Sequence, residues 1–322
     1  MVDSRNKQFS KRVEATLTDI LAQHALRGQS LTVAYSGGLD STVLLYALKN
    51  IAPMLDLHLT AVHVHHGLSE NADEWSDHCT LTCAQLGIEL SVVRVLVKPE
   101  LGEGIEAAAR KVRLDAVLAH SSGWVCMAHH ANDQAETVLH NLLRGSGLRG
   151  AGGVPVLRGR VFRPFLTLPK EFLLAYAIEH QLRWVEDESN KDRYFTRNYL
   201  RHEVVPLLKA RFPRAVEQLS IAARRFADAQ ALLDDLALLD LKKDQFLFPI
   251  ETSLLLNLTE VRARNLMRSL LSGNKVQLPD ERRLNEFVRQ VRTAANDRHP
   301  SLETSTYRLW VALGELHFKK KT

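Results

Sequence analysis

One hexapeptide near the N-terminus carries the residue types best suited to chemistry. It consists of Ser36, Gly37, Gly38, Leu39, Asp40 and Ser41. The two glycines can adopt positive φ angles and let a ligand approach the backbone, and the free N–H groups of a following helix attract anions. The two serines add hydroxyl donors. Asp40 would repel bare phosphate, but it can bind Mg²⁺, which bridges carboxylates and phosphates. The hexapeptide therefore predicts a polyphosphate site with Asp40 as the Mg²⁺ ligand.

A second candidate group lies around residue 133. His129 and His130 come just before Asn132, Asp133 and Glu136. Asp133 and Glu136 are three residues apart, so they share one face at the start of a predicted helix and complement its dipole. A purely structural alternative is that Asn132 or Asp133 is the N-cap and Glu136 its capping-box partner. The two preceding histidines favour a functional site.

Several arginines are candidates for binding phosphate, since a guanidinium can hold a phosphate through two hydrogen bonds. Arg110 lies in an alanine-rich helical segment. Other arginines would form a positive track that a phosphate-rich polymer could follow. These are Arg144, Arg149, Arg158, Arg163, Arg197 and Arg201. Each one alone is equally compatible with solvated surface charge.

Short apolar runs alternate with amphipathic segments through the first half of the chain. Strands are expected at residues 31–35, 57–64, 90–97 and 124–128, and helices at 8–26, 42–48, 71–86 and 104–120. This alternation predicts a parallel sheet covered by helices on both faces, which binds ligands beyond the carboxyl ends of its strands. Ser36, His63 to Gly67 and His129 to Asp133 all follow strands, so we expect them at one edge of the sheet.

The rest of the chain predicts a second, mainly helical domain. A glycine-rich loop without regular structure is expected at 144–153, a hairpin at 154–165, a helix at 168–182, an exposed polar segment at 187–196, and a helix from Arg197. We place a boundary near residue 212, giving an α/β domain at 1–212 and a helical domain at 213–322. The second domain should hold one long helix beyond Pro213, helices at 253–272 and 280–295, and a strand-like end at 301–318.

Composition narrows the class of protein further. With 322 residues the chain is long enough for two domains, and the net charge of +5 suits an anionic partner without requiring one. Cys79, Cys83 and Cys126 are too few for a disulfide framework, and buried thiols explain them better than a metal site does. No apolar run approaches the roughly 18 residues of a membrane span. We therefore expect a cytoplasmic protein without membrane association.

Eight motifs in register resemble one family. They are S-G-G-L-D-S, H-V-H-H-G-L-S, E-A-A-A-R, A-H-H-A-N-D-Q-A-E-T, L-L-R-G-S-G, R-P-F, D-E-S-N and R-N-x-x-R. The first is similar to the PP-loop of ATP pyrophosphatases, and the whole set resembles tRNA(Ile)-lysidine synthetases over residues 31–206. The resemblance implies an enzyme that uses ATP and Mg²⁺ to adenylate C2 of the wobble cytidine in a CAU-anticodon isoleucine tRNA. Free L-lysine would then displace AMP.

The resemblance also implies roles for individual residues. The hexapeptide would hold the pyrophosphate end of ATP, with Asp40 on Mg²⁺. Arg110 and Arg201 would stabilise phosphate or the adenylated base, and Asp133 and Glu136 would receive lysine. Arg144 and Arg197 would contact a substrate. Carboxylates raise the pKa of the lysine ammonium, although attack needs the neutral amine, so a base such as His129 must take the proton late.

Two departures from the family's pattern accompany the resemblance. Asn132 stands where many relatives have a second acid, which weakens a role for two adjacent carboxylates. Larger relatives continue into a further C-terminal domain that grips the tRNA, whereas this chain ends as strand-like sequence begins. A shorter form and a truncated one both fit.

The alternatives come from the same fold and from a different class. Another adenylating PP-loop tRNA-modifying enzyme is the near alternative. A thiolating enzyme of this kind would need cysteines placed to carry sulfur or an iron–sulfur cluster, and the chain has no C-x-x-C. An amidotransferase relative would need a source of ammonia. A non-catalytic RNA-binding module is disfavoured by the intact hexapeptide and Asp133. The sequence does not determine the oligomeric state, and a homodimer is one option.

Overall fold

The computed structural model describes residues 2–67, 69–96, 105–186, 196–293 and 299–321. The chain divides into two compact units, Met1–Arg225 and Phe226–Thr322. The division falls inside α10 (Ala215–Leu241), the long helix predicted beyond Pro213. The boundary predicted near residue 212 lies just before this helix.

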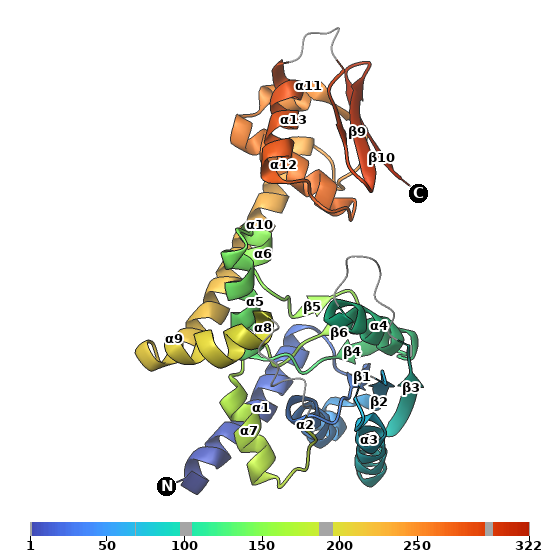
Figure 1. Cartoon of the computed structure of the whole chain (residues 1–322), viewed down its shortest axis with the longest axis vertical. Helices are drawn as coiled ribbons and strands as arrows, with labels where there is room; N and C mark the ends of the chain where they lie inside the picture. The colour runs from blue at the N-terminus through green and yellow to red at the C-terminus, as the bar shows by residue number, and fades with distance from the viewer. Residues whose placement is uncertain (1, 68, 97–104, 187–195, 294–298, 322) are drawn as a thin grey trace. The chain divides into compact units, whose positions relative to one another are not determined.

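A six-stranded sheet forms the centre of the first unit, in the order β3-β2-β1-β4-β6-β5. Its strands are β1 (Ser30–Ala34), β2 (His58–His65), β3 (Glu89–Arg94), β4 (Trp124–Cys126), β5 (Leu157–Arg158) and β6 (Val161–Phe162). All neighbours are parallel except the β5–β6 hairpin. The predicted parallel sheet and the small hairpin are thus both confirmed (Figure 1).

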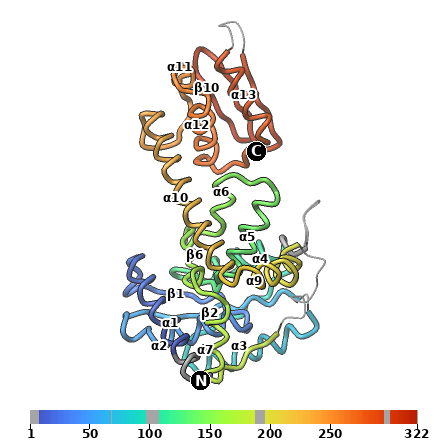
Figure 2. The backbone as a smooth tube through the Cα atoms, turned by 90° about the vertical axis from the view of Figure 1, so that its left-hand side faces the viewer, coloured from blue at the N-terminus to red at the C-terminus, as the bar shows by residue number. Residues whose placement is uncertain are grey.

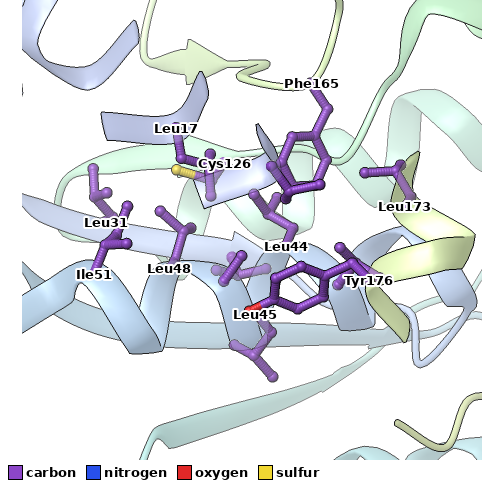
Figure 3. Packing of buried hydrophobic residues seen from close by; sticks show 14 of the residues in the cluster. Leu17, Leu31, Leu44, Leu45, Leu48, Ile51, Cys126, Phe165, Leu173 and Tyr176 are labelled. Carbon is purple, nitrogen blue, oxygen red and sulfur yellow. The ribbon is translucent and has the colours of Figure 1, made fainter. Parts of the chain in front are cut away.

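Helices cover both faces of this sheet. The helices of the first unit before α10 are α1 (Val2–Gln23), α2 (Leu39–Leu55), α3 (Ala72–Leu86), α4 (Ile105–Ala119), α5 (Ala131–Leu143), α6 (Leu148–Ala151), α7 (Lys170–Glu179), α8 (Thr196–Tyr199), the π-helical turn η2 (Leu200–Val204) and α9 (Val205–Arg211). Leu17 of α1, Leu44 of α2 and Tyr176 of α7 pack on one face (Figure 3). Val117 of α4 packs on the other with Val62. Successive strand residues point to opposite faces, so β4 presents Cys126 to one apolar cluster and Val125 to the other.

The chain after α7 returns to the edge of the sheet where α5 begins. Both α8 and η2 contact α5, although about 60 residues separate them in sequence (Figure 2). The polar segment predicted at 187–196 lies outside the described residues except for its last residue. The helix predicted from Arg197 begins at Thr196 and widens into a π-helical turn at Leu200, a feature common near functional sites.

Two predictions about local structure are wrong. The glycine-rich segment 144–153 contains the short helix α6, which Asn141 anchors by donating from Nδ2 to the carbonyl of Gly150 at 2.7 Å. The helix predicted at 253–272 is two helices, α11 (Thr252–Asn257) and α12 (Glu260–Gly273). Leu258 is extended and Thr259 caps α12 through its side chain, so the local cap overrides the apolar periodicity.

The second unit combines helices with a small antiparallel sheet. Its remaining elements are β7 (Ile250–Glu251), α13 (Glu281–Thr293), β8 (Ser301–Glu303), β9 (Tyr307–Ala312) and β10 (Glu315–Lys320), with strand order β7-β10-β9-β8. Leu270, Phe287 and Leu309 lie in its core. The strand-like end predicted at 301–318 is therefore confirmed as three strands. None of the described helices has the length and apolar character needed to cross a membrane.

Candidate functional site

The strand order places the candidate residues at a topological switch point. The chain moves from β1 to β2 on one side, while β4 pairs with β1 on the other. The loops that follow β1 and β4 therefore open next to each other, where ligands of such sheets bind. Asp40 and His130 confirm the expected convergence, because Oδ2 of Asp40 lies 3.4 Å from Nε2 of His130.

The loop after β1 is held in shape by its own hydroxyls and by one glycine. Ser36 and Ser41 share a hydrogen bond of 3.0 Å between their Oγ atoms, and Ser41 Oγ also donates to the carbonyl of Gly38. Gly37 has φ of +80°, and a Cβ there would lie 3.0 Å from the sulfur of Cys79. Gly38 is extended, with φ of −73°, so only one of the two glycines uses the left-handed region.

Asp40 lies in the first turn of α2 and has one unsatisfied oxygen. Its Oδ1 is buried and has no hydrogen-bond partner among the described residues. No group of three or more His, Cys, Asp or Glu side chains within the described ranges could hold a metal ion alone. A single free carboxylate oxygen fits Mg²⁺, which takes few protein ligands and completes its octahedron with phosphates and water.

His130 is the N-cap of α5. Its Nδ1 lies 3.3 Å from the backbone N–H of Asp133, whose Oδ2 accepts from the N–H of His130 at 2.9 Å. The predicted alternative of a capping box is thus correct in kind but wrong in its residues, since Asn132 instead accepts from the N–H of Lys170. Burial would lower the pKa of His130, but Asp133 and Asp40 outweigh it and raise the pKa.

Two acids and two arginines form a closed network, which we call the ion cluster: Asp133, Glu136, Arg197 and Arg201. Arg197 donates to both acids at 3.0 Å. Arg201 donates to Glu136 at 2.8 and 3.0 Å and to Asp133 at 3.1 Å. Glu136 is only 1% exposed. Two negative and two positive charges thus neutralise each other at the start of α5.

The ion cluster sets the charge states of its members. Burial alone would raise the pKa of Asp133, but His130 and Arg197 hold it well below its usual range. Burial alone would lower the pKa of Arg201, but Glu136 raises it. The sequence identified all four residues but not that they meet. Arg197 and Arg201 follow residues outside the described ranges and lie more than 60 positions from the acids.

His129 has the opposite environment. Its Nε2 accepts from Nη2 of Arg110 at 3.1 Å, and its Nδ1 is buried without a partner among the described residues. Burial, together with the cations of Arg110 and Arg163, lowers the pKa of His129 to about 3. A ring that stays neutral and whose acceptor nitrogen is occupied is a poor base, so the predicted proton-accepting role is not supported.

The predicted positive track does not form as one exposed surface. Arg144, Arg149 and Arg158 are exposed, and Arg144 lies against His140 with Nη1 3.3 Å from the ring. Arg163 is buried, so it does not lie on an exposed track. Arg197 and Arg201 belong to the neutral ion cluster.

Sequence reasoning missed the residues that support the loop from behind. Val185 donates its N–H to the carbonyl of Gly37 at 3.0 Å, and its Cγ2 would lie 3.1 Å from a Cβ added at that glycine. His63 Nδ1 bonds the carbonyl of Tyr35 at 2.9 Å. An isolated valine after a helix carries no sequence signal for such a role, whereas His63 had been placed at this edge by its position at the end of the strand predicted at 57–64.

Comparison with known families first defines the class. Residues 6–208 match the family model described as the PP-loop domain, and residues 251–317 match the one described as the TilS substrate binding domain. The U34-tRNA thiolase NcsA from Methanococcus maripaludis has a similar fold, with a TM-score of 0.58 and 17% identity over 69% of this chain and 80% of that one. The first unit is thus a PP-loop α/β domain, as its geometry indicates.

Curated relatives narrow the class to one family. The tRNA(Ile)-lysidine synthases of Alkalilimnicola ehrlichii, Pseudomonas fluorescens and Nitrosomonas europaea are 45%, 41% and 37% identical to this chain, over 84%, 88% and 93% of it. The chain spans 62%, 68% and 67% of their lengths. On this likeness, the chain belongs to the tRNA(Ile)-lysidine synthase family.

Proposed function

We propose that the chain ligates L-lysine to C2 of the wobble cytidine of a CAU-anticodon isoleucine tRNA and converts ATP to AMP and pyrophosphate. The observation that supports this most is the free Oδ1 of Asp40, buried at the switch point beside the glycine loop. A lone carboxylate oxygen without a partner, next to backbone donors for phosphate, suits an ATP-consuming site that works with Mg²⁺. The names of the relatives supply the substrate.

The loop and Asp40 would prepare the nucleotide. Backbone donors at the start of α2 and the hydroxyls of Ser36 and Ser41 hold the β- and γ-phosphates, and Leu39 contributes its backbone. Asp40 would hold Mg²⁺, which supplies electrostatic stabilisation of the leaving pyrophosphate. His130, at 3.4 Å from Oδ2 of Asp40, fixes the orientation of that carboxylate and leaves Oδ1 facing the ligand.

The proposed reaction has two steps. The C2 oxygen of cytidine attacks the α-phosphorus, and pyrophosphate leaves. The lysine ε-amine then attacks C2, AMP leaves with the oxygen, and one proton is released. Arg110 and Arg201 would stabilise the phosphate or the adenylated base, while Arg144 and Arg197 would contact substrate. Cations near developing negative charge stabilise a transition state, which is the reason for assigning arginines to these roles.

The ion cluster explains how carboxylates could bind the lysine ammonium without keeping its amine protonated. Asp133 and Glu136 would receive the lysine, but two carboxylates alone would raise the pKa of its ammonium and hinder attack. Arg197 and Arg201 lie within 3.1 Å of the same carboxylates, so they offset this effect. The amine then loses its proton more easily, and no strong base is required next to it.

A thiolating enzyme of the same fold is the second candidate. It would need accessible sulfur at the edge of the sheet, whereas Cys79, Cys83 and Cys126 are all buried. Burial raises the pKa of Cys83 to about 11 and that of Cys126 to about 12. Thiols of this kind do not act as nucleophiles or cluster ligands at neutral pH, so thiolation is disfavoured.

The test is a lysine incorporation assay. Radiolabelled L-lysine, ATP and Mg²⁺ are incubated with the protein and a CAU-anticodon transcript, and the same transcript carrying UAU is the control. We expect label in the CAU transcript only, together with equimolar AMP. Label in neither transcript, at protein concentrations that bind RNA, would contradict the proposal. Light scattering on the same sample tests the homodimer, and location in the cytoplasm stays a prediction.

A further inference from the structure

Arg163 is an almost fully buried arginine without an acidic partner among the residues that the structure describes. It directly follows β6 and is only 7% exposed. Its Nη1 donates to the carbonyl of Pro155 at 3.1 Å, while its Nε is buried and has no partner among the described residues. None of the acidic side chains in the described ranges forms an ion pair with it. Burying a guanidinium without a counter-charge costs free energy unless an anion pairs with it.

Other positive groups surround this position instead of negative ones. Burial, together with the nearby cations of Arg110 and Arg158, lowers the pKa of Arg163 to about 10. Arg110 also donates to Nε2 of His129, so the hydrogen of that neutral ring lies on Nδ1. Nδ1 of His129 and Nε of Arg163 are thus two buried N–H donors that have no acceptor in the described part of the chain, at the ends of the adjacent strands β4 and β6.

The place of these donors in the sheet indicates which phosphate they meet. The glycine loop follows β1, and β4 lies between β1 and β6. Strands are about 4.8 Å apart, so the end of β6 lies roughly 10 Å from the loop. If the modified base reacts above β4, the RNA backbone attached to that base would pass over the end of β6. The site therefore suits an RNA phosphate better than the pyrophosphate of ATP.

We propose that Arg163, with Arg110 and Arg158 beside it, binds one backbone phosphodiester of the RNA substrate, next to the base that is modified. We call this site the phosphodiester subsite. It deepens the proposed function, on which it rests for the identity of the RNA. Bidentate recognition of a phosphate is a property of guanidinium that lysine does not share.

The first experiment measures RNA affinity for an anticodon stem-loop at several salt concentrations. Arg163→Gln should weaken binding about 10-fold or more and reduce the slope of log affinity against log salt by about one phosphate contact. Its melting temperature should not fall, since the change removes an unpaired buried charge. Arg158 is exposed, so Arg158→Gln should disturb the fold less than Arg163→Gln does, and it should weaken RNA binding about 3-fold.

The matched control is Arg27→Gln. Arg27 is exposed and lies before β1, so it is at the opposite end of the strands from the subsite. Its substitution should leave RNA affinity and salt slope unchanged. An equal loss of affinity in Arg27→Gln and Arg163→Gln would show only a general effect of net charge and would overturn the subsite.

The second experiment locates the phosphate. Neutral methylphosphonates replace single phosphates of the stem-loop in turn. In the wild-type protein, a methylphosphonate at one position beside the wobble base should weaken RNA binding about 10-fold. The Arg163→Gln protein should show no further loss of RNA affinity when that same phosphate is replaced. Equal losses in both proteins at every position would overturn the proposal. A loss of affinity for a non-hydrolysable ATP analogue, with RNA binding intact, would overturn it by assigning the site to ATP.

Failure of the subsite differs from failure of the proposed function. If the wild-type protein incorporates lysine and Arg163→Gln binds RNA normally, the subsite is wrong and the function stands. If the wild-type protein binds the stem-loop with the expected phosphate dependence but incorporates no lysine, the function is wrong and the subsite stands.

Discussion

Two groups of charged side chains at the same edge of the sheet differ in how they are satisfied. In the ion cluster each carboxylate is matched by a guanidinium at 2.8–3.1 Å. Close by, Asp40 Oδ1, His129 Nδ1 and Arg163 Nε are buried without partners among the described residues. Since buried polar groups are nearly always paired, the second group indicates where ligands bind. The first group holds the start of α5 in place, and on the proposed function its carboxylates also receive the lysine.

The largest expected effect comes from Asp40→Asn. The change removes the free carboxylate oxygen but keeps the side-chain shape, so lysine incorporation should fall at least about 10³-fold. RNA affinity should persist, and the melting temperature should change by less than about 3 °C, because the contact with His130 becomes a neutral hydrogen bond instead of being left empty. Steady-state incorporation, RNA binding and thermal unfolding check this together. Unchanged turnover would show that the assignment of Asp40 to Mg²⁺ is wrong.

Unlike Asp40, the ion cluster should affect stability as well as lysine incorporation. Glu136→Gln leaves two arginines facing one carboxylate, so the free energy of unfolding should fall by about 2–3 kcal/mol. For a unit of this size the melting temperature should drop by about 4–12 °C. Glu217→Gln breaks the exposed pair with Arg214 and is the control, with an expected loss below about 1 kcal/mol. Equal losses in the two variants would remove the distinction between the groups.

His130 joins the two groups and should make stability depend on pH. Its folded pKa is raised, so its contribution is fully present below the unfolded value of about 6.5 and is lost as pH rises through the folded value. Denaturant unfolding from pH 6 to 9 should show this decline in the wild-type protein. His130→Asn, which keeps a capping acceptor, should lack it. The same slope in both proteins would contradict the pairing with Asp40 and Asp133.

The smallest effect is expected for the shape of the pH–rate profile in His129→Gln. Because the pKa of His129 is about 3, the ring stays neutral from pH 5.5 to 8.5. Lysine incorporation by the variant should therefore keep the wild-type profile, with a rate loss below about 10²-fold. A variant profile that lacks a limb near neutral pH would restore His129 as the base.

The parts of the site that depend on local sequence could be predicted. A β-branched run, two glycines and a helical run are enough to place the loop after β1, and the alternation of elements fixes the parallel sheet. Strand ends then bring Asp40 and His130 to one edge. Each of these inferences needs only neighbouring residues and the general handedness of βαβ connections.

The remaining features depend on contacts between distant segments. No local pattern tells whether Arg197 and Arg201 face solvent or meet Asp133 and Glu136, because burial and pairing are decided by how α8 and η2 pack on α5. The same holds for Arg163. An arginine is expected at the surface, but the position of Arg163 after β6 buries it. The capping of α5 was misassigned because histidine is an uncommon N-cap.

The most direct test of the central claim follows the fate of the adenylyl group. ATP labelled at the α-phosphate is incubated with the protein and the CAU transcript in the absence of lysine, and the RNA is then isolated under denaturing conditions. We expect labelled AMP on the RNA, its release when lysine is added, and no label with Asp40→Asn. Labelled AMP that forms on lysine when RNA is absent would contradict the account, because the activated group would then be the amino acid.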